Sequence, residues 1–126
     1  MSLEMDIAKQ GYEMFFRPYQ ALALRYLWRL DGEGASSRDV WVQVNEDLMG
    51  KSTISRASII NFLNDMVDEG ALSFIETTGR GGYRRIYSSM YDEAGFKRYM
   101  ANKIISRLLE TWPEAARDAI RGIKGK

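Results

Sequence analysis

The stretch ISRASIINFLNDMVDEGAL, residues 54–72, carries a regular helical pattern. Ser55 is a good N-cap for this helix, and Gly70 is a good residue to end it. Large apolar side chains recur at intervals of three and four residues, as on one face of an α-helix: Ile59, Phe62, Leu63, Met66 and Val67. The opposite face instead bears small or amide side chains, namely Ala57, Asn61 and Asn64. The buried face is thereby explained, and the exposed face needs a function.

Two further helices are predicted before this one. Pro18 suits the first turn of a helix over residues 18–30, which is apolar over most of its circumference and should lie at the centre of the core. Ser36 and Asp39 have the spacing of a capping box and predict the start of the next helix. The buried stripe of that helix is expected to comprise Val40, Val44 and Leu48.

After Gly70 the apolar period changes from that of a helix to that of a strand. The segments ALSFIETT and YRRIYSS are rich in aromatic and β-branched residues, and GRGG between them suits a hairpin tip. Asp92 can cap a long helix that runs to about Glu110, and Thr111 with Glu114 forms a second capping box that starts a short last helix. The predicted fold is mainly α with a small β-hairpin, a winged helix-turn-helix followed by a long C-terminal helix.

Three regions are expected along the chain. Residues 1–17 form an N-terminal extension whose first residues resemble a cloning remnant, and which contains a short extra helix packed on the body. Residues 18–90 form the winged helix-turn-helix DNA-binding domain, and residues 91–126 form a helical dimerisation region.

Composition excludes several classes of site. The chain has 126 residues with no Cys and no His, so disulfides, thiolate chemistry, imidazole catalysis and the usual zinc ligands are excluded, and no metal or cofactor is expected. The carboxylates are scattered, no Ser has a candidate base, and GRGG lacks the Lys-Ser/Thr of a phosphate-binding loop. An enzyme is therefore not expected. No apolar run approaches the roughly 18 residues of a membrane span, and no signal peptide is evident, so a cytoplasmic location is expected.

Charge is small overall but unevenly distributed. The net charge is +1, and the chain runs from an acidic first half to a basic C-terminal region. A phosphate-binding surface must therefore be local, with moderate and salt-sensitive affinity. The basic residues available for it near the predicted helix-turn-helix and hairpin are Lys51, Arg56, Arg80, Arg84 and Arg85.

The exposed face of the 54–72 helix suits a DNA major groove. In a helix-turn-helix the second helix enters that groove with its N-terminal residues on base edges. Asn61 can pair with adenine N6 and N7, and Ile60 can touch a thymine methyl group. Arg84 and Arg85 alternate on their strand, so at most one shares the DNA surface. The predicted DNA-binding residues are Lys51, Ser52, Ser55, Arg56, Ala57, Ser58, Ile60, Asn61, Arg80 and Arg84. An ordinary solvated helix face and a solubilising hairpin remain the alternatives.

The last long helix carries more apolar surface than a three-helix body needs. Such a surplus usually indicates a partner, and a symmetric dimer is the commonest kind. The alternative is that the stripe folds back onto the chain's own hairpin or first helix. The predicted dimerisation residues are Phe96, Met100, Ile104, Ile105, Leu108 and Trp112.

Together these segments resemble the penicillinase repressor family of winged-helix regulators. The resemblance covers about residues 19–90 and rests on matches in the first helix, the end of the recognition helix and the hairpin. The matching residues are Leu27, Trp28, Met66, Val67, Gly70, Leu72, Gly79, Arg80 and Tyr87. Regulators of the phenolic acid and multiple antibiotic resistance families share much of this pattern. The resemblance implies a homodimeric repressor whose C-terminal helices form the dimer interface.

Two departures from that family limit what the resemblance implies. Copper-responsive relatives end in a cysteine-rich metal site, and this chain has no Cys. Some relatives are cut by a protease at an Asn-Phe bond, whereas Asn102 here precedes Lys103. The inducing signal is therefore unknown. The sequence thus predicts a homodimeric repressor that binds double-stranded DNA, and the alternative is a winged-helix module that binds protein.

Overall fold

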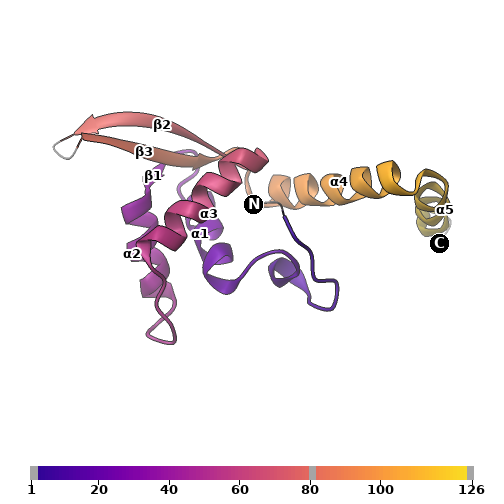
Figure 1. Cartoon of the computed structure of the whole chain (residues 1–126), viewed down its shortest axis with the longest axis horizontal. Helices are drawn as coiled ribbons and strands as arrows, with labels where there is room; N and C mark the ends of the chain where they lie inside the picture. Colours follow the sequence, from indigo (N-terminus) through magenta and orange to yellow (C-terminus); the bar gives the residue numbers. More distant parts are fainter. Residues whose placement is uncertain (1–2, 80–81, 125–126) are drawn as a thin grey trace. The chain divides into compact units, whose positions relative to one another are not determined.

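The computed structural model of the chain describes residues 3–79 and 82–124. The chain divides into two compact units, Met1–Asp92 and Glu93–Lys126. The first unit contains a short 3-10 helix, three α-helices and a small sheet (Figure 1). Its helical elements are η1 (Gly11–Met14), α1 (Pro18–Arg29), α2 (Ser37–Asp47) and α3 (Arg56–Glu69).

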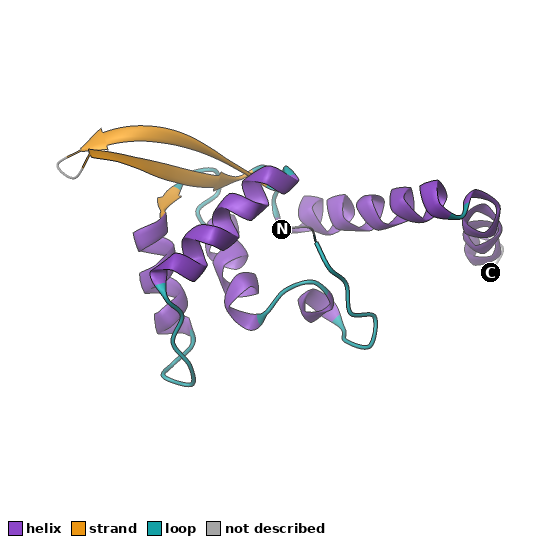
Figure 2. Cartoon of the chain, in the orientation of Figure 1, coloured by secondary structure: helices purple, strands orange, loops and turns teal. Residues whose placement is uncertain are grey.

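A three-stranded antiparallel sheet completes the first unit (Figure 2). Its strands are β1 (Ala35–Ser36), β2 (Leu72–Gly79) and β3 (Gly82–Ser89), in the order β1-β3-β2. The hairpin pairs Phe74 with Tyr87 and Glu76 with Arg85. Three helices with this sheet form a winged helix-turn-helix, so the predicted fold class is confirmed. The strand β1 was not predicted from the sequence.

Local signals explain where the helices begin and end. The Ser36 hydroxyl accepts a hydrogen bond from the Asp39 amide at 3.2 Å, and the Asp39 carboxylate accepts one from the Ser36 amide at 3.4 Å. The predicted capping box therefore starts α2. Gly70 ends α3 with a φ of 88°, a left-handed conformation that glycine adopts without a steric penalty.

The core of the first unit lies between the helices and the sheet. Helix α1 contacts α2, α3, β3 and η1, as expected for a helix at the centre of the core. Gly34 lets the chain approach β3 closely, because a Cβ atom there would lie 2.8 Å from the Tyr87 carbonyl oxygen. The buried apolar side chains of the three helices are Ala23, Leu24, Leu27, Val40, Val44, Ile59, Phe62, Leu63 and Met66.

The N-terminal segment packs on this core, as predicted. Its short helix is the 3-10 turn η1, and Phe16 after it is buried. The Phe16 ring meets the edge of the Phe62 ring with centroids 5.9 Å apart. Tyr12 lies beside Trp28 of α1 at 5.7 Å. These ring contacts tie the extension to α1 and α3.

The second unit consists of two helices, α4 (Glu93–Thr111) and α5 (Pro113–Lys124). The bounds of α4 agree closely with the predicted helix from Asp92 to about Glu110. Pro113 occupies the first position of α5, where a missing amide hydrogen costs no helical hydrogen bond. Among the helices in the described part of the chain, none has the length and apolar character required to cross a bilayer.

Candidate nucleic-acid interface

Two side chains of α2 fix the start of α3. The amide of Asn45 accepts a hydrogen bond from the Ile54 N–H at 2.9 Å and donates one to the Ile54 carbonyl at 3.2 Å. The indole N–H of Trp41 donates to the same carbonyl at 2.8 Å. Ile54 directly precedes the N-cap Ser55, so the entry of the chain into α3 is held from both sides. The sequence analysis missed this clamp, and an asparagine inside a helix was the available signal.

The N-terminal end of α3 exposes most of the predicted contact residues. The Ser55 hydroxyl caps the helix by accepting a hydrogen bond from the Ser58 amide at 3.1 Å. Arg56, Ala57 and Asn61 are exposed, whereas Ser58 and Ile60 are half-buried. The exposed Lys51 and Ser52 lie in the loop before the helix. The structure thus brings eight of the ten predicted DNA-binding residues to this helix and the loop that precedes it.

The hairpin is joined to α3 by Asn64, which therefore has a structural partner within the chain. Its side-chain oxygen accepts hydrogen bonds from the Tyr87 hydroxyl at 2.6 Å and from the Arg85 guanidinium at 3.0 Å. The same guanidinium stacks over the Phe74 ring, 4.0 Å from its centroid, and lies 4.0 Å from the Glu76 carboxylate. The orientation of the hairpin relative to α3 is thus set by one amide and two partners.

The hairpin places its arginines on opposite faces, as predicted. Arg85 shares the face of Tyr87, next to α3, whereas Arg84 pairs with Thr77 on the other face. The geometry therefore favours Arg85 over the predicted Arg84 as the residue that continues the surface of α3. Contact of either with DNA stays a prediction. Arg80, the predicted residue at the tip, lies outside the described residues.

We expect Asn64→Ala to destabilise the first unit. The substitution removes the acceptor of the buried Tyr87 hydroxyl, and an unsatisfied buried donor costs about 1 to 3 kcal/mol. Urea titration gives the free energy of unfolding. Asn61→Ala removes the same group from an exposed position on the same helix and is the matched control, expected within about 0.5 kcal/mol of the unchanged protein. Equal stability of the two variants would contradict the role of Asn64.

The predicted dimerisation residues fall into two groups. Phe96 and Met100 are 1% and 6% exposed within a single chain, so including them in a surface for a second chain is wrong. Ile105, Leu108 and Trp112 are exposed, at 41%, 40% and 62%, and Ile104 is half-buried. The exposed apolar surface therefore begins later along α4 than predicted.

Charge differs between the two units. Residues 1–92 contain 10 Lys and Arg against 13 Asp and Glu, whereas residues 93–126 contain 8 against 4. Asp65 and Asp68 lie toward the C-terminal end of α3, away from its cationic start. The described residues contain no cluster of three or more His, Cys, Asp or Glu that could hold a metal ion. Attraction for an anion is therefore confined to small areas of the first unit.

Comparison with known proteins gives two likenesses in fold. No protein-family model matches the chain, and no curated protein matches it, so the resemblance to the penicillinase repressor family stays a hypothesis. A structure described as the DNA recognition and protein interaction domains of HOP2 is 21% identical, with 56% of this chain and 97% of that chain covered and a TM-score of 0.39. TA0346 from Thermoplasma acidophilum, described as a candidate transcriptional regulator, is 20% identical, with 73% and 93% covered and a TM-score of 0.47.

Proposed function

We propose that this protein is a sequence-specific DNA-binding transcriptional regulator, a repressor that acts as a homodimer on an inverted-repeat operator. The observation that carries the proposal is the exposed N-terminal half of α3, held in place by the Asn45 clamp and the Asn64 contacts. Its short side chains let the helix axis approach DNA closely, and the amide of Asn61 can donate to and accept from one adenine edge.

The charges near α3 support the same orientation. Lys51 and Arg56 are exposed at its start, where the helix N-terminus adds a partial positive charge. Asp65 and Asp68 would repel phosphates if the C-terminal half entered the groove. The first two turns therefore face the bases, and the remainder of α3 rises away from the duplex.

The exposed apolar side chains of the second unit support the homodimer. Ile105, Leu108 and Trp112 of α4 and Ile123 of α5 are all exposed in the single chain. Burying them against the same surface of a second copy would form a symmetric interface. Two copies of α3 held by such a dimer would read two half-sites, about one DNA turn or a multiple of it apart.

We expect Asn61→Ala to weaken operator binding by about 1 to 3 kcal/mol, because one bidentate amide–adenine contact is lost. Fluorescence anisotropy with the operator and with single-base variants measures the loss and its dependence on sequence. Asn102→Ala, which alters an exposed asparagine of α4, is the matched control and should bind as the unchanged protein does. Unaltered operator preference in Asn61→Ala would show that another face reads the bases.

The second candidate function is a winged-helix module that binds protein. It is favoured by the excess of acidic residues in the first unit and by the exposed Ile75 and Tyr83 on the hairpin. Salt dependence separates the two. If Lys51 and Arg56 contact phosphates in both subunits, log affinity for random duplex DNA should fall against log salt with a slope of about −3.6, or about a hundredfold between roughly 50 and 200 mM salt. A flat response would favour the protein-binding module.

A further inference from the structure

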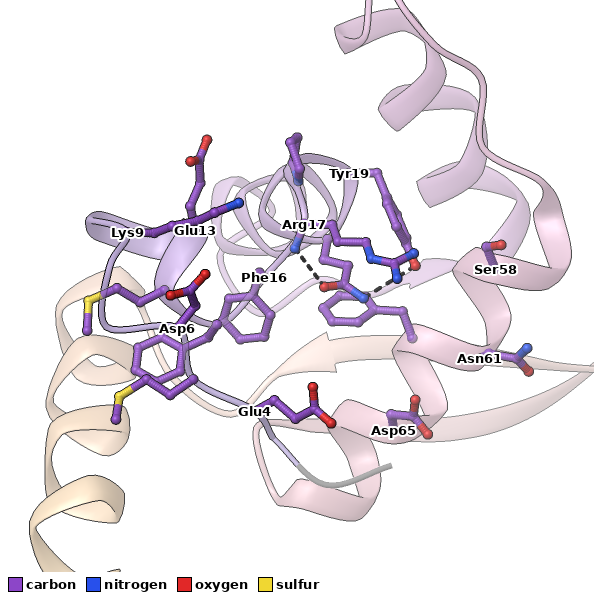
Figure 3. A pocket seen from close by; sticks show the side chains of 16 residues that line it. Glu4, Asp6, Lys9, Glu13, Phe16, Arg17, Tyr19, Ser58, Asn61 and Asp65 are labelled. Carbon is purple, nitrogen blue, oxygen red and sulfur yellow. Dashed lines mark hydrogen bonds between the residues drawn. The ribbon is translucent and has the colours of Figure 1, made fainter. Parts of the chain in front are cut away.

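A pocket of about 620 Å³ lies between the N-terminal segment and α3 (Figure 3). Ser58, Asn61 and Asp65 line it along α3, and Asp6, Lys9 and Glu13 line it from the opposite side. All of its lining residues belong to the first unit. The volume falls within the roughly 300 to 1,000 Å³ typical of small-molecule sites. Its position matters because it includes part of the face of α3 assigned above to DNA.

The wall opposite α3 is built by backbone hydrogen bonds. The Asp6 amide donates to the Met14 carbonyl at 2.7 Å, and the Lys9 amide donates to the Asp6 carbonyl at 3.1 Å. The Asp6 carboxylate also accepts from the Ala8 amide at 3.0 Å. Residues 6–14 therefore form a closed loop, which the buried Phe16 anchors against Phe62.

The lining combines negative charge with apolar and aromatic surface. It carries two cationic side chains, Lys9 and Arg17, against a larger group of carboxylates: Glu4, Asp6, Glu13 and Asp65. Its apolar part includes the half-buried Met14, Phe15 and Tyr19, which leave part of their surface open. Aromatic faces and carboxylates both attract a cation, and the thioether adapts to an irregular apolar body.

We infer that this pocket binds a small organic cation with an apolar body, and that the bound cation releases the protein from DNA. The second part rests on the proposed function, because the ligand and a DNA base would both occupy the space beside Ser58 and Asn61. Binding of the two is then mutually exclusive, and the cation is an inducer of the repressor. The carboxylates supply selectivity for charge, and the aromatic and thioether groups supply selectivity for an apolar ligand.

Three probes test the pocket on the full chain by isothermal titration calorimetry. Tetraphenylphosphonium has the proposed charge and body, tetraphenylborate has nearly the same shape with the opposite charge, and tetramethylammonium has the charge without the large apolar body. We expect binding in the order phosphonium, tetramethylammonium, borate. Equal binding of the phosphonium and the borate, or no binding of the phosphonium at millimolar concentration, would overturn the inference.

Neutral substitutions locate the site. Glu4→Gln, Asp6→Asn and Glu13→Gln together should weaken tetraphenylphosphonium binding by about tenfold, since three exposed charge contacts are lost. The side-chain oxygen that Asp6→Asn retains can still accept from the Ala8 amide, so the loop keeps its hydrogen bond. Asp31→Asn, Glu33→Gln and Glu46→Gln together make the same charge change at exposed positions outside the pocket and form the matched control. Equal binding by the two triple variants would overturn the pocket as the site.

A competition experiment separates this inference from the proposed function. We expect tetraphenylphosphonium to displace the unchanged protein and the control variant from operator DNA, and to displace the pocket variant only at about tenfold higher concentration. Displacement of all three proteins at one concentration would overturn the inference. If the phosphonium binds the pocket but leaves DNA bound, the ligand site stands, and the assignment of DNA to this face of α3 fails.

Discussion

Leu108→Asp is expected to convert the dimer to a monomer and to abolish tight operator binding. The side chain is 40% exposed in the single chain, and the proposed interface would bury it against a second copy. A charge without a partner in such an interface costs about 3 to 5 kcal/mol, enough to dissociate a dimer of ordinary affinity. Sedimentation velocity measures the oligomeric state, and circular dichroism shows whether the helices remain folded.

Ser106→Asp is the matched control for this experiment. It adds the same charge at an exposed position of α4 two residues away, on a different side of the helix. We expect this variant to remain dimeric. A dimeric Leu108→Asp protein would move the interface away from α4, and unfolding of that variant would show that Leu108 belongs to the monomer's own core.

Phe62→Ala is expected to lower the free energy of unfolding of the first unit by about 3 to 5 kcal/mol. The side chain is 2% exposed, and its ring lies 5.9 Å from Phe16 and 6.3 Å from Tyr19. Truncation removes the contact between α3 and the N-terminal segment and leaves a cavity. Urea titration measures the change, with Asn61→Ala as the exposed control on the same helix.

A loss below about 1 kcal/mol would contradict this account of the core, because it would mean that the Phe62 site collapses without cost. The same variant also reports on the pocket. Phe16 and Tyr19 both pack on Phe62, so loosening of the N-terminal segment should weaken tetraphenylphosphonium binding as well.

The sequence predicted elements whose signals are local. Ser36 and Asp39 lie three residues apart, and Ser55 and Gly70 flank a single helical stripe, so the helix ends could be read without knowledge of the tertiary structure. The strand β1 escaped prediction because it has two residues and pairs Ala35 with Tyr87, far along the chain. A strand so short has no detectable period of its own.

The candidate site was predicted in part for the same reason. The exposed face of α3 follows from helical periodicity, and the structure bears out the exposure of Arg56, Ala57 and Asn61. Periodicity cannot show that Asn64 is engaged by Arg85 and Tyr87, because these partners lie on a distant strand. The pocket likewise depends on how the N-terminal segment returns to α3, which no local pattern encodes.

Selection of bound DNA from a pool of random duplexes tests the central claim most directly. The protein is mixed with the pool at about 150 mM salt, and the bound fraction is sequenced after repeated rounds. We expect an inverted repeat whose half-sites are centred about one DNA turn or a multiple of it apart, with an adenine that loses its enrichment when the selection is repeated with Asn61→Ala. Bound sequences that match the starting pool would contradict a sequence-specific regulator.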